Sequence, residues 1–171
     1  YYLHSVDGFV YMSEQVHSEL RAYSDAPALF SPHPLFENFG ERVERSEACV
    51  RLGLDPANRY VLFFGLIRDY KGLDLLLDAW AQLRRAGRTE GRRLIVAGEF
   101  YTAREPYLNR IADNGLQDEV LLHDRFIPDD DVKYYFSAAD FVVQPYKTAT
   151  QSGVTQIAYQ FCVPMLSLIH I

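Results

Sequence analysis

The sequence predicts an α/β protein built on a doubly wound, Rossmann-like parallel sheet. From about residue 60 onward, short continuous apolar runs alternate with longer segments whose apolar residues recur at helical spacing. Unbroken apolar runs are typical of strands buried on both faces. Strands that alternate with helices at this spacing form βαβ units, with parallel strands and right-handed crossovers.

Each of the first four predicted strands after residue 58 is a short apolar run followed by a predicted helix, and a fifth strand begins at residue 163. The strands are expected at residues 60–65, 93–98, 119–124, 141–146 and 163–166, and the helices at 72–87, 105–115, 129–139 and 152–161. The first of these helices has an apolar stripe made by Leu73, Leu76, Leu77, Trp80 and Leu83. Asp129 or Asp130 is the predicted N-cap of the third helix.

Residues 1–58 have a different organisation. We expect a buried strand over 6–13, a helix over 14–23 capped by Ser13, a proline-broken extended segment over 28–36 and a short helix over 44–54. The prediction is that 1–58 is the end of one domain plus a linker. Residues 59–165 then form a second, Rossmann-like domain that is truncated.

Composition excludes several classes of protein. The net charge of −6 argues against a nucleic-acid partner, which would require a basic face. No stretch approaches the roughly 20 apolar residues of a membrane span. Cys49 and Cys162 stand far apart without a CxxC motif, so we expect reduced thiols packed as small apolar residues. With no signal peptide and no initiator methionine, the chain is expected to be a fragment of a cytoplasmic protein.

The last six residues, LSLIHI (166–171), are the translation of CTGTCTCTTATACACATC, a transposase adapter used in sequencing libraries. We therefore expect the natural sequence to stop near Met165, and we leave His170 out of the functional argument. The alternative is an ordinary apolar strand.

Candidate ligand-binding residues follow the predicted strands, because ligands of open parallel sheets bind beyond the carboxyl ends of the strands. Ser152, Gly153 and Val154 begin a helix, whose free N–H groups and partial positive charge suit a phosphate. Arg68 and Lys71 add formal charge from a neighbouring loop. The alternatives are that Ser152 is a plain N-cap and that the two basic residues are solvated surface.

Other familiar motifs are missing. The sequence has no GxGxxG, no GxxxxGK[ST] and no GxSxG. His4, His17, His33 and His123 have no partner at a meaningful spacing, so we interpret them as structural or exposed. The acidic run 129–131 is interpreted as a helix N-terminus rather than a metal-binding motif.

Four segments in order, VLFFGLIRDYKGLDLLLDAW, LIVAGEFY, FIPDDDVKYYFSAADFVVQPY and ATQSGVTQIAYQFCVPM, resemble the group 1 glycosyltransferases. These are retaining, nucleotide-sugar-dependent enzymes of the GT-B fold, in which two Rossmann-like domains face a cleft. The resemblance covers about residues 60–165, the donor-binding domain, and more weakly 1–58. It implies transfer of a sugar from a UDP- or GDP-linked donor to an acceptor hydroxyl.

The resemblance also implies a set of site residues. Lys71 matches a lysine that contacts the donor diphosphate, and Arg68 stands in for an arginine that the family often has at the position of Leu66. The amides of 152–154 match the site of the distal phosphate. The remaining residues assigned by position are Gly98, Phe126 and Ile127 for the nucleobase and ribose pocket, and Gly65, Thr150 and Gln151 near the donor sugar. No catalytic residue is assigned.

One departure from the family pattern concerns two glutamates that are separated by seven residues. Their positions hold Ala149 and Ile157 here, so the ribose contact must come from elsewhere, for example from downstream of Met165. The resemblance implies no metal and no cofactor beyond the nucleotide sugar. The acceptor can be a saccharide, a lipid-linked compound or a small molecule, with peripheral association at the cytoplasmic face of the membrane left open. The alternatives are a non-catalytic GT-B-like binding module and a sugar-nucleotide epimerase, and the fragment alone is expected to be inactive.

Overall fold

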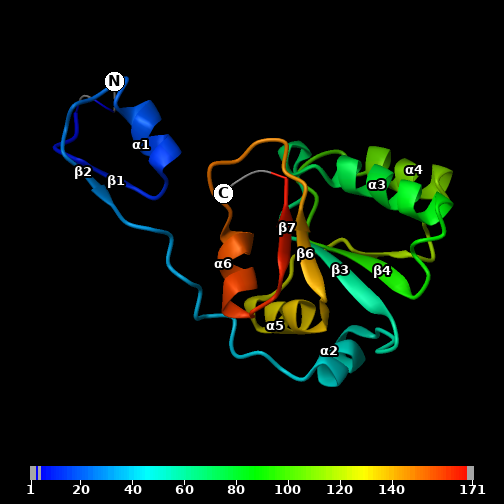
Figure 1. The fold of residues 1–171 in the computed structure, drawn as a ribbon. Helices are drawn as coiled ribbons and strands as arrows, with labels where there is room; N and C mark the ends of the chain where they lie inside the picture. Colours follow the sequence, from blue (N-terminus) through cyan, green and yellow to red (C-terminus); the bar gives the residue numbers. More distant parts are fainter. Residues whose placement is uncertain (1–2, 4, 169–171) are drawn as a thin grey trace.

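The computed structural model describes residue 3 and residues 5–168, and its centre is a five-stranded parallel sheet (Figure 1). The strand order is β5-β4-β3-β6-β7. The strands are β3 (Arg59–Phe64), β4 (Arg92–Ala97), β5 (Val120–His123), β6 (Phe141–Gln144) and β7 (Met165–Ser167). The chain moves outward from β3 to β5 and then crosses back to β6, so the predicted doubly wound α/β class is confirmed.

Helices cover both faces of this sheet. One face carries α3 (Leu73–Arg85) and α4 (Glu105–Asp113), and the other carries α5 (Asp129–Ala138) and α6 (Gly153–Gln160) (Figure 1). Alternate residues of β3 enter the two cores: Leu62 packs with the α5 and α6 side, and Phe63 with the α3 and α4 side. A strand buried on both faces has to be apolar throughout, which explains its unbroken apolar run.

The predicted apolar stripe of α3 is confirmed for four of its five residues. Leu73, Leu76, Leu77 and Trp80 are buried, whereas Leu83 is 41% exposed because it lies where the helix passes the edge of the core. The Trp80 indole Nε1 donates to a carboxylate oxygen of Glu119 at 2.8 Å, which satisfies its buried N–H group.

The N-terminal part is a small β–α–β unit that lies to one side of the main sheet (Figure 1). β1 (Phe9–Tyr11) pairs in parallel with β2 (Ala28–Phe30), and α1 (Glu14–Leu20) connects them. Ser13 is the N-cap of α1, as predicted, since its Oγ accepts from the Val16 amide at 3.3 Å. The predicted buried strand is wrong in length and burial. The strand has three residues, and its Val10 is 65% exposed. Among the described helices, α1 packs against it.

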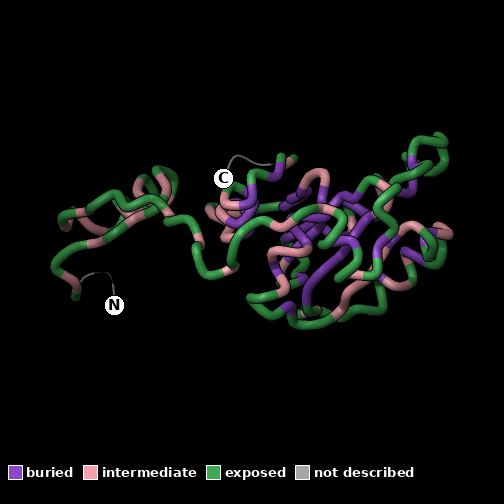
Figure 2. The backbone as a smooth tube through the Cα atoms, turned by 90° about the horizontal axis from the view of Figure 1, so that it is seen from below, coloured by how far each residue is buried: buried purple, intermediate pink, exposed green. Residues whose placement is uncertain are grey.

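An extended segment leads from this unit to α2 (Arg45–Leu52), which packs against α5. Figure 2 shows that the chain before α2 is exposed or half-buried, whereas buried residues fill the strands of the main sheet. Cys49 of α2 is fully buried in the core that also contains α5. The predicted division of the chain at residues 58 and 59 stays a prediction.

Two local predictions are wrong. Pro128, not Asp129 or Asp130, is the N-cap of α5, and no side chain caps this helix. Proline presets the backbone angle just before a helix, so the helix begins at Asp129 itself. Cys162 is exposed rather than packed, because it lies in the turn just beyond the end of α6, where its backbone is left-handed with φ 51°. Neither cysteine forms a disulfide.

Leu166 and Ser167 belong to β7, where they pair with Val143 and Gln144. The adapter origin of residues 166–171 stays a prediction, because strand pairing by Leu166 and Ser167 does not depend on it. His4 and His170 lie outside the described residues.

Candidate functional site

The carboxyl ends of β3 and β4 approach each other through two glycines. Gly65 has φ 95° and Gly98 has φ 145°, and both angles disfavour residues with a Cβ. A Cβ at Gly98 would lie 2.2 Å from the carbonyl oxygen of Gly65. These glycines therefore allow the loops after the two strands to form one continuous edge.

Lys71 lies at the end of a short 3₁₀ helix, η2 (Asp69–Lys71), between β3 and α3. Gly72 closes this turn at φ 70°, and a Cβ there would lie 2.0 Å from the Pro145 carbonyl oxygen. The loop after β3 is therefore packed directly on the loop after β6. Gly72 can be replaced only if one of the two loops moves.

The Lys71 ammonium is held inside this packed region, with only 9% of the residue exposed. Its Nζ lies 5.8 Å from the centroid of the Tyr146 ring and 3.1 Å from the place where a Cβ of Gly65 would be. In the described chain no carboxylate pairs with it. Burial, and secondarily the charge of Arg68, lowers the pKa of Lys71 from 10.5 to about 8. The solvated-surface interpretation of Lys71 is therefore wrong.

Arg68 stands at the outer side of the same turn. It is exposed, and its guanidinium lies 5.3 Å from the centroid of the Tyr101 ring. The two predicted basic residues thus differ in kind, since one is a buried charge and the other a solvent-facing guanidinium beside an aromatic ring.

Lys147, which the sequence argument did not select, joins the two loops. Its ammonium contacts the carboxylates of Asp69 and Asp74, each at 3.0 Å, and its amide donates to the Tyr70 carbonyl at 2.7 Å. Hydrogen bonds to Asp74 and then Asp69 raise its pKa. The sequence offers no local signal for these ion pairs, because Asp69 and Asp74 lie more than 70 residues before Lys147 and have Arg68 and Lys71 as nearer basic neighbours.

The start of α6 lies on the other side of Gly65. Ser152 occupies the N-cap position, but its hydroxyl does not cap the helix. Instead it accepts from Gln144 Nε2 at 3.0 Å and lies 3.1 Å from the hydroxyl of Tyr146, so the plain N-cap interpretation is wrong. A Val154 methyl lies 3.5 Å from the Cβ position of Gly65. Gly65 therefore stands between Lys71 and the first turn of α6.

Gly153 has no Cβ, which by itself would let a phosphate approach the backbone closely. The direction of its missing Cβ faces Phe36 instead, with ring atoms at 3.4 and 3.6 Å from a Cβ built there. An anion at this helix start would therefore meet backbone N–H groups rather than the space left by the glycine.

A cavity of about 190 Å³ opens beside Gly65 and Gly98. The predicted nucleobase residues Phe126 and Ile127 also line it, so four sequence-predicted residues meet at one place. Its other lining residues are Phe39, Phe64, Leu66, Glu99, Asp129 and Val132. The cavity combines aromatic walls with two carboxylates at the carboxyl edge of the sheet.

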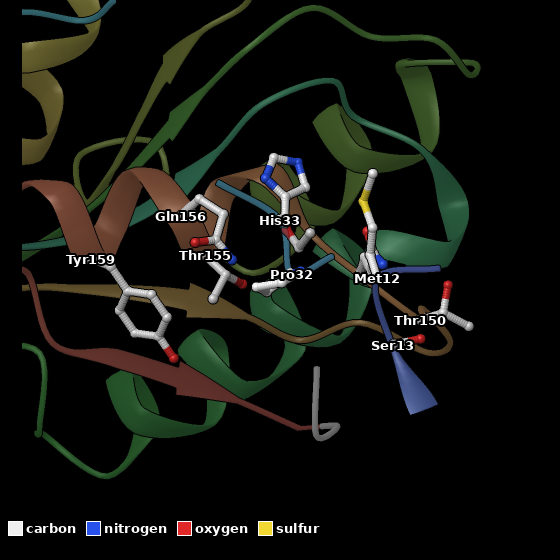
Figure 3. A pocket seen from close by; sticks show the side chains of 10 residues that line it. Met12, Ser13, Pro32, His33, Thr150, Thr155, Gln156 and Tyr159 are labelled. Atoms are coloured by element: carbon white, nitrogen blue, oxygen red, sulfur yellow. The ribbon is translucent and has the colours of Figure 1, made fainter. Parts of the chain in front are cut away.

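Thr150 and Gln151 line a different pocket, of about 280 Å³, together with Ser152 and the polar face of α6. Figure 3 shows Thr155, Gln156 and Tyr159 along this helix, with Pro32 and His33 of the N-terminal segment facing them. The predicted donor-sugar group is thus divided, because Gly65 lines the first cavity.

One of the two family glutamate positions is buried in the core, and three histidines contact neighbouring rings or polar groups. Ile157 is 6% exposed in the core beneath α6, where a carboxylate would lose its hydration. His123 Nδ1 lies 2.8 Å from the Tyr135 hydroxyl, and burial, followed by the charge of Arg125, lowers the pKa of His123. His17 stacks on Tyr11, and His33 Nδ1 lies 2.9 Å from the Pro34 carbonyl oxygen.

Within residues 3 and 5–168, no group of three or more histidine, cysteine or acidic residues is arranged to hold a metal ion. No helix in the same part of the chain is long and apolar enough to cross a membrane.

Comparison with solved structures gives the class of fold. The chain superposes on WaaG, a glycosyltransferase involved in lipopolysaccharide biosynthesis, with a TM-score of 0.79 at 16% identity, covering 92% of this chain and 43% of WaaG. It superposes on sucrose-phosphate synthase from Thermosynechococcus elongatus with a TM-score of 0.82 at 21% identity, covering 96% of this chain and 41% of the synthase. The fold is therefore that of GT-B glycosyltransferases.

Sequence comparison gives the family. The family model described as "Glycosyl transferases group 1" matches residues 58–168. A lipopolysaccharide core biosynthesis mannosyltransferase of Rhizobium meliloti is 31% identical over 74% of this chain and 36% of its own length. A D-inositol 3-phosphate glycosyltransferase of Segniliparus rotundus is 34% identical over 70% of this chain and 26% of its own length. The chain belongs to the group 1 glycosyltransferases, and it spans about a third or less of the length of these relatives.

Proposed function

We propose that this chain supplies the donor-diphosphate site of a retaining glycosyltransferase that uses a nucleotide diphosphate sugar. The observation that carries the proposal is Lys71, a buried ammonium at the carboxyl edge of the sheet that has no carboxylate partner among the described residues. Burying an unpaired charge is costly unless an anion comes to meet it. The uncapped start of α6 across Gly65 supplies N–H groups for the same anion.

The chemistry follows from this placement. During transfer, the bond between the anomeric carbon and the diphosphate oxygen breaks, and negative charge develops on the leaving diphosphate. Lys71, Arg68 and the amides of Gly153 and Val154 stabilise that charge. The acceptor hydroxyl attacks the anomeric carbon from the same face, a new C–O bond forms, and the leaving phosphate takes the hydroxyl proton. The proposal requires no metal ion, so chelation with EDTA should leave donor binding unchanged.

The cavity beside Gly98 is proposed to hold the nucleobase. Phe126 and Ile127 supply apolar contact area there, and Phe126 is 66% exposed, available to stack on a base. Solved structures of HepE from Anabaena contain UDP and glucose in one case and UDP-glucose in another. We propose a UDP- or GDP-linked donor for this protein.

The rest of the activity is proposed from the relatives. Their names describe a lipopolysaccharide core mannosyltransferase and D-inositol 3-phosphate glycosyltransferases. We accordingly propose a saccharide, lipid-linked or small-molecule acceptor, and a cytoplasmic enzyme that can associate with the cytoplasmic face of the membrane. Cell fractionation of the complete protein tests the location.

Titration calorimetry of the complete protein with UDP and GDP tests the donor site. We expect binding of at least one nucleotide, weakened by Lys71→Met and much less affected by Lys133→Met, a matched change at a lysine of α5 that does not line the cavity. Absence of heat with both nucleotides would refute the proposal.

A non-catalytic GT-B-like module remains the second candidate, because Ala149 and Ile157 replace the carboxylates that the family pattern has. Nucleotide binding without sugar transfer to any acceptor would favour it. Release of free epimerised sugar from donor alone would instead indicate an epimerase.

A further inference from the structure

We propose that the carboxylate of Glu99 binds the ribose hydroxyls of the donor nucleotide. The inference rests on the proposed nucleotide site and names a residue for a contact that the sequence left without one. Glu99 lines the same cavity as Gly65, Gly98 and Phe126.

The position of Glu99 follows from the geometry of a nucleoside diphosphate. The ribose joins the base to the phosphates, so it must lie between Phe126 on one side and Lys71 with Gly65 on the other. Glu99 follows Gly98 directly, and Gly98 is the residue whose backbone touches Gly65. The backbone of Glu99 therefore lies at the boundary between the nucleobase cavity and the diphosphate site.

The backbone of Glu99 is fixed by the neighbouring loop. The Ile67 amide donates to the Glu99 carbonyl at 2.8 Å, and the Tyr101 amide donates to the Ile67 carbonyl at 2.9 Å. These bonds extend the pairing of β3 and β4 by one bridge, between Ile67 and Phe100. Glu99 thus stands on a strand-like extension rather than on an independent loop, and this reduces the entropy lost when its side chain meets a ligand.

Two carboxylates line the cavity, and among the described residues only that of Glu99 accepts no hydrogen bond. Within the described residues its side chain forms no ion pair, and no side chain or amide donates to it. The other carboxylate of the cavity, on Asp129, accepts from Asn38 Nδ2 at 3.2 Å. The helix that follows the diphosphate loop offers no alternative, since α6 contains no acidic residue.

The hydrogen-bonding groups of the ribose and of the Glu99 carboxylate are complementary. The two ribose hydroxyls are neighbouring donors, and an ionised carboxylate has two acceptor oxygens with matching spacing. In dinucleotide-binding Rossmann domains, an acidic residue of the same kind hydrogen-bonds the ribose 2′-hydroxyl. Glu99 lies two residues beyond β4, the second strand of the Rossmann-like sheet, and so reaches the ribose from the sheet edge rather than from a helix.

The test compares ribose with deoxyribose. Calorimetry of the complete protein is run with UDP, GDP and their 2′-deoxy forms, for the wild type, Glu99→Ala and Asp129→Asn. Removing a charge-assisted hydrogen bond weakens binding about tenfold, so the wild type should prefer the ribonucleotide by about that factor. Glu99→Ala should bind both forms equally, and Asp129→Asn should keep the preference. Because the Glu99 side chain is exposed, the thermal unfolding midpoint of the Glu99→Ala protein should equal that of the wild type.

The outcomes separate the two proposals. If the wild type binds no nucleotide, the donor site itself is refuted. If it binds nucleotides but does not distinguish ribose from deoxyribose, or if Glu99→Ala keeps the distinction, the donor site stands and the role of Glu99 is wrong.

Discussion

Replacing Lys71 by methionine should stabilise the free protein while it weakens nucleotide binding. The pKa of Lys71 falls from 10.5 to about 8 because the ammonium is buried and lies near Arg68. The charged form is therefore disfavoured by the fold. The difference corresponds to about 3 kcal/mol of unfolding free energy, at about 1.4 kcal/mol for each pKa unit. Methionine keeps the length and apolar stem of lysine without the charge.

The pH dependence gives this prediction its sign. Below pH 8 Lys71 is protonated in both the folded and the unfolded state, so the buried charge lowers the unfolding free energy of the wild type by its full amount. Between pH 8 and 10.5 the unfolded state binds more protons than the folded state, so wild-type stability rises with pH. The advantage of Lys71→Met should thus fall from about 3 kcal/mol at pH 7 to about 1 kcal/mol at pH 9.5.

Urea unfolding of both proteins at the two pH values measures the difference. Lys71→Arg is the matched control, since guanidinium stays charged at both pH values and its stability should lack the rise. A Lys71→Met protein that is less stable than the wild type at pH 7, or equally stabilised at both pH values, would contradict the assignment of Lys71 as an unpaired buried charge.

Three further changes test other parts of the site. Lys147→Met should lower nucleotide affinity several-fold, because it releases the turn that holds Lys71 from the loop after β6. Lys147→Arg should retain most of the wild-type affinity, and equal affinities of the two variants would refute the positioning role. Phe126→Ala should weaken nucleotide binding by about tenfold through lost stacking, without lowering the unfolding midpoint, because this ring is mostly exposed. Cys162→Gly should raise the unfolding free energy by about 1 kcal/mol by relieving the left-handed backbone, and Cys162→Ala should not.

Much of the sheet could be predicted because its strands are buried on both faces. Such strands must be apolar where both faces are buried, and β3 shows this pattern from Tyr60 onward and β4 from Leu94 onward. The N-terminal strand was predicted too long and too buried, because an apolar run does not reveal which elements will cover it. Val10 is apolar and still 65% exposed.

The candidate site was only partly predictable. The rule that ligands bind at the carboxyl ends of parallel strands located Lys71, Gly98 and Phe126 correctly at one edge. It could not show that Lys71 is buried and Arg68 exposed, since both occur in the same polar loop. Nor could it assign the Ser152 hydroxyl to Gln144, which lies eight residues earlier.

The sequence by itself determined the fold class, the order of the elements and the family, because these depend on the periodicity and spacing of residues along the chain. Tertiary structure alone decided which polar groups meet and, within the part of the chain that the structure describes, which charge lacks a partner and which carboxylate is free. These properties depend on contacts between loops far apart in sequence, such as Gly72 against Pro145 and Gly98 against Gly65. Glycines allow those approaches, and the burial they produce changes the pKa of Lys71.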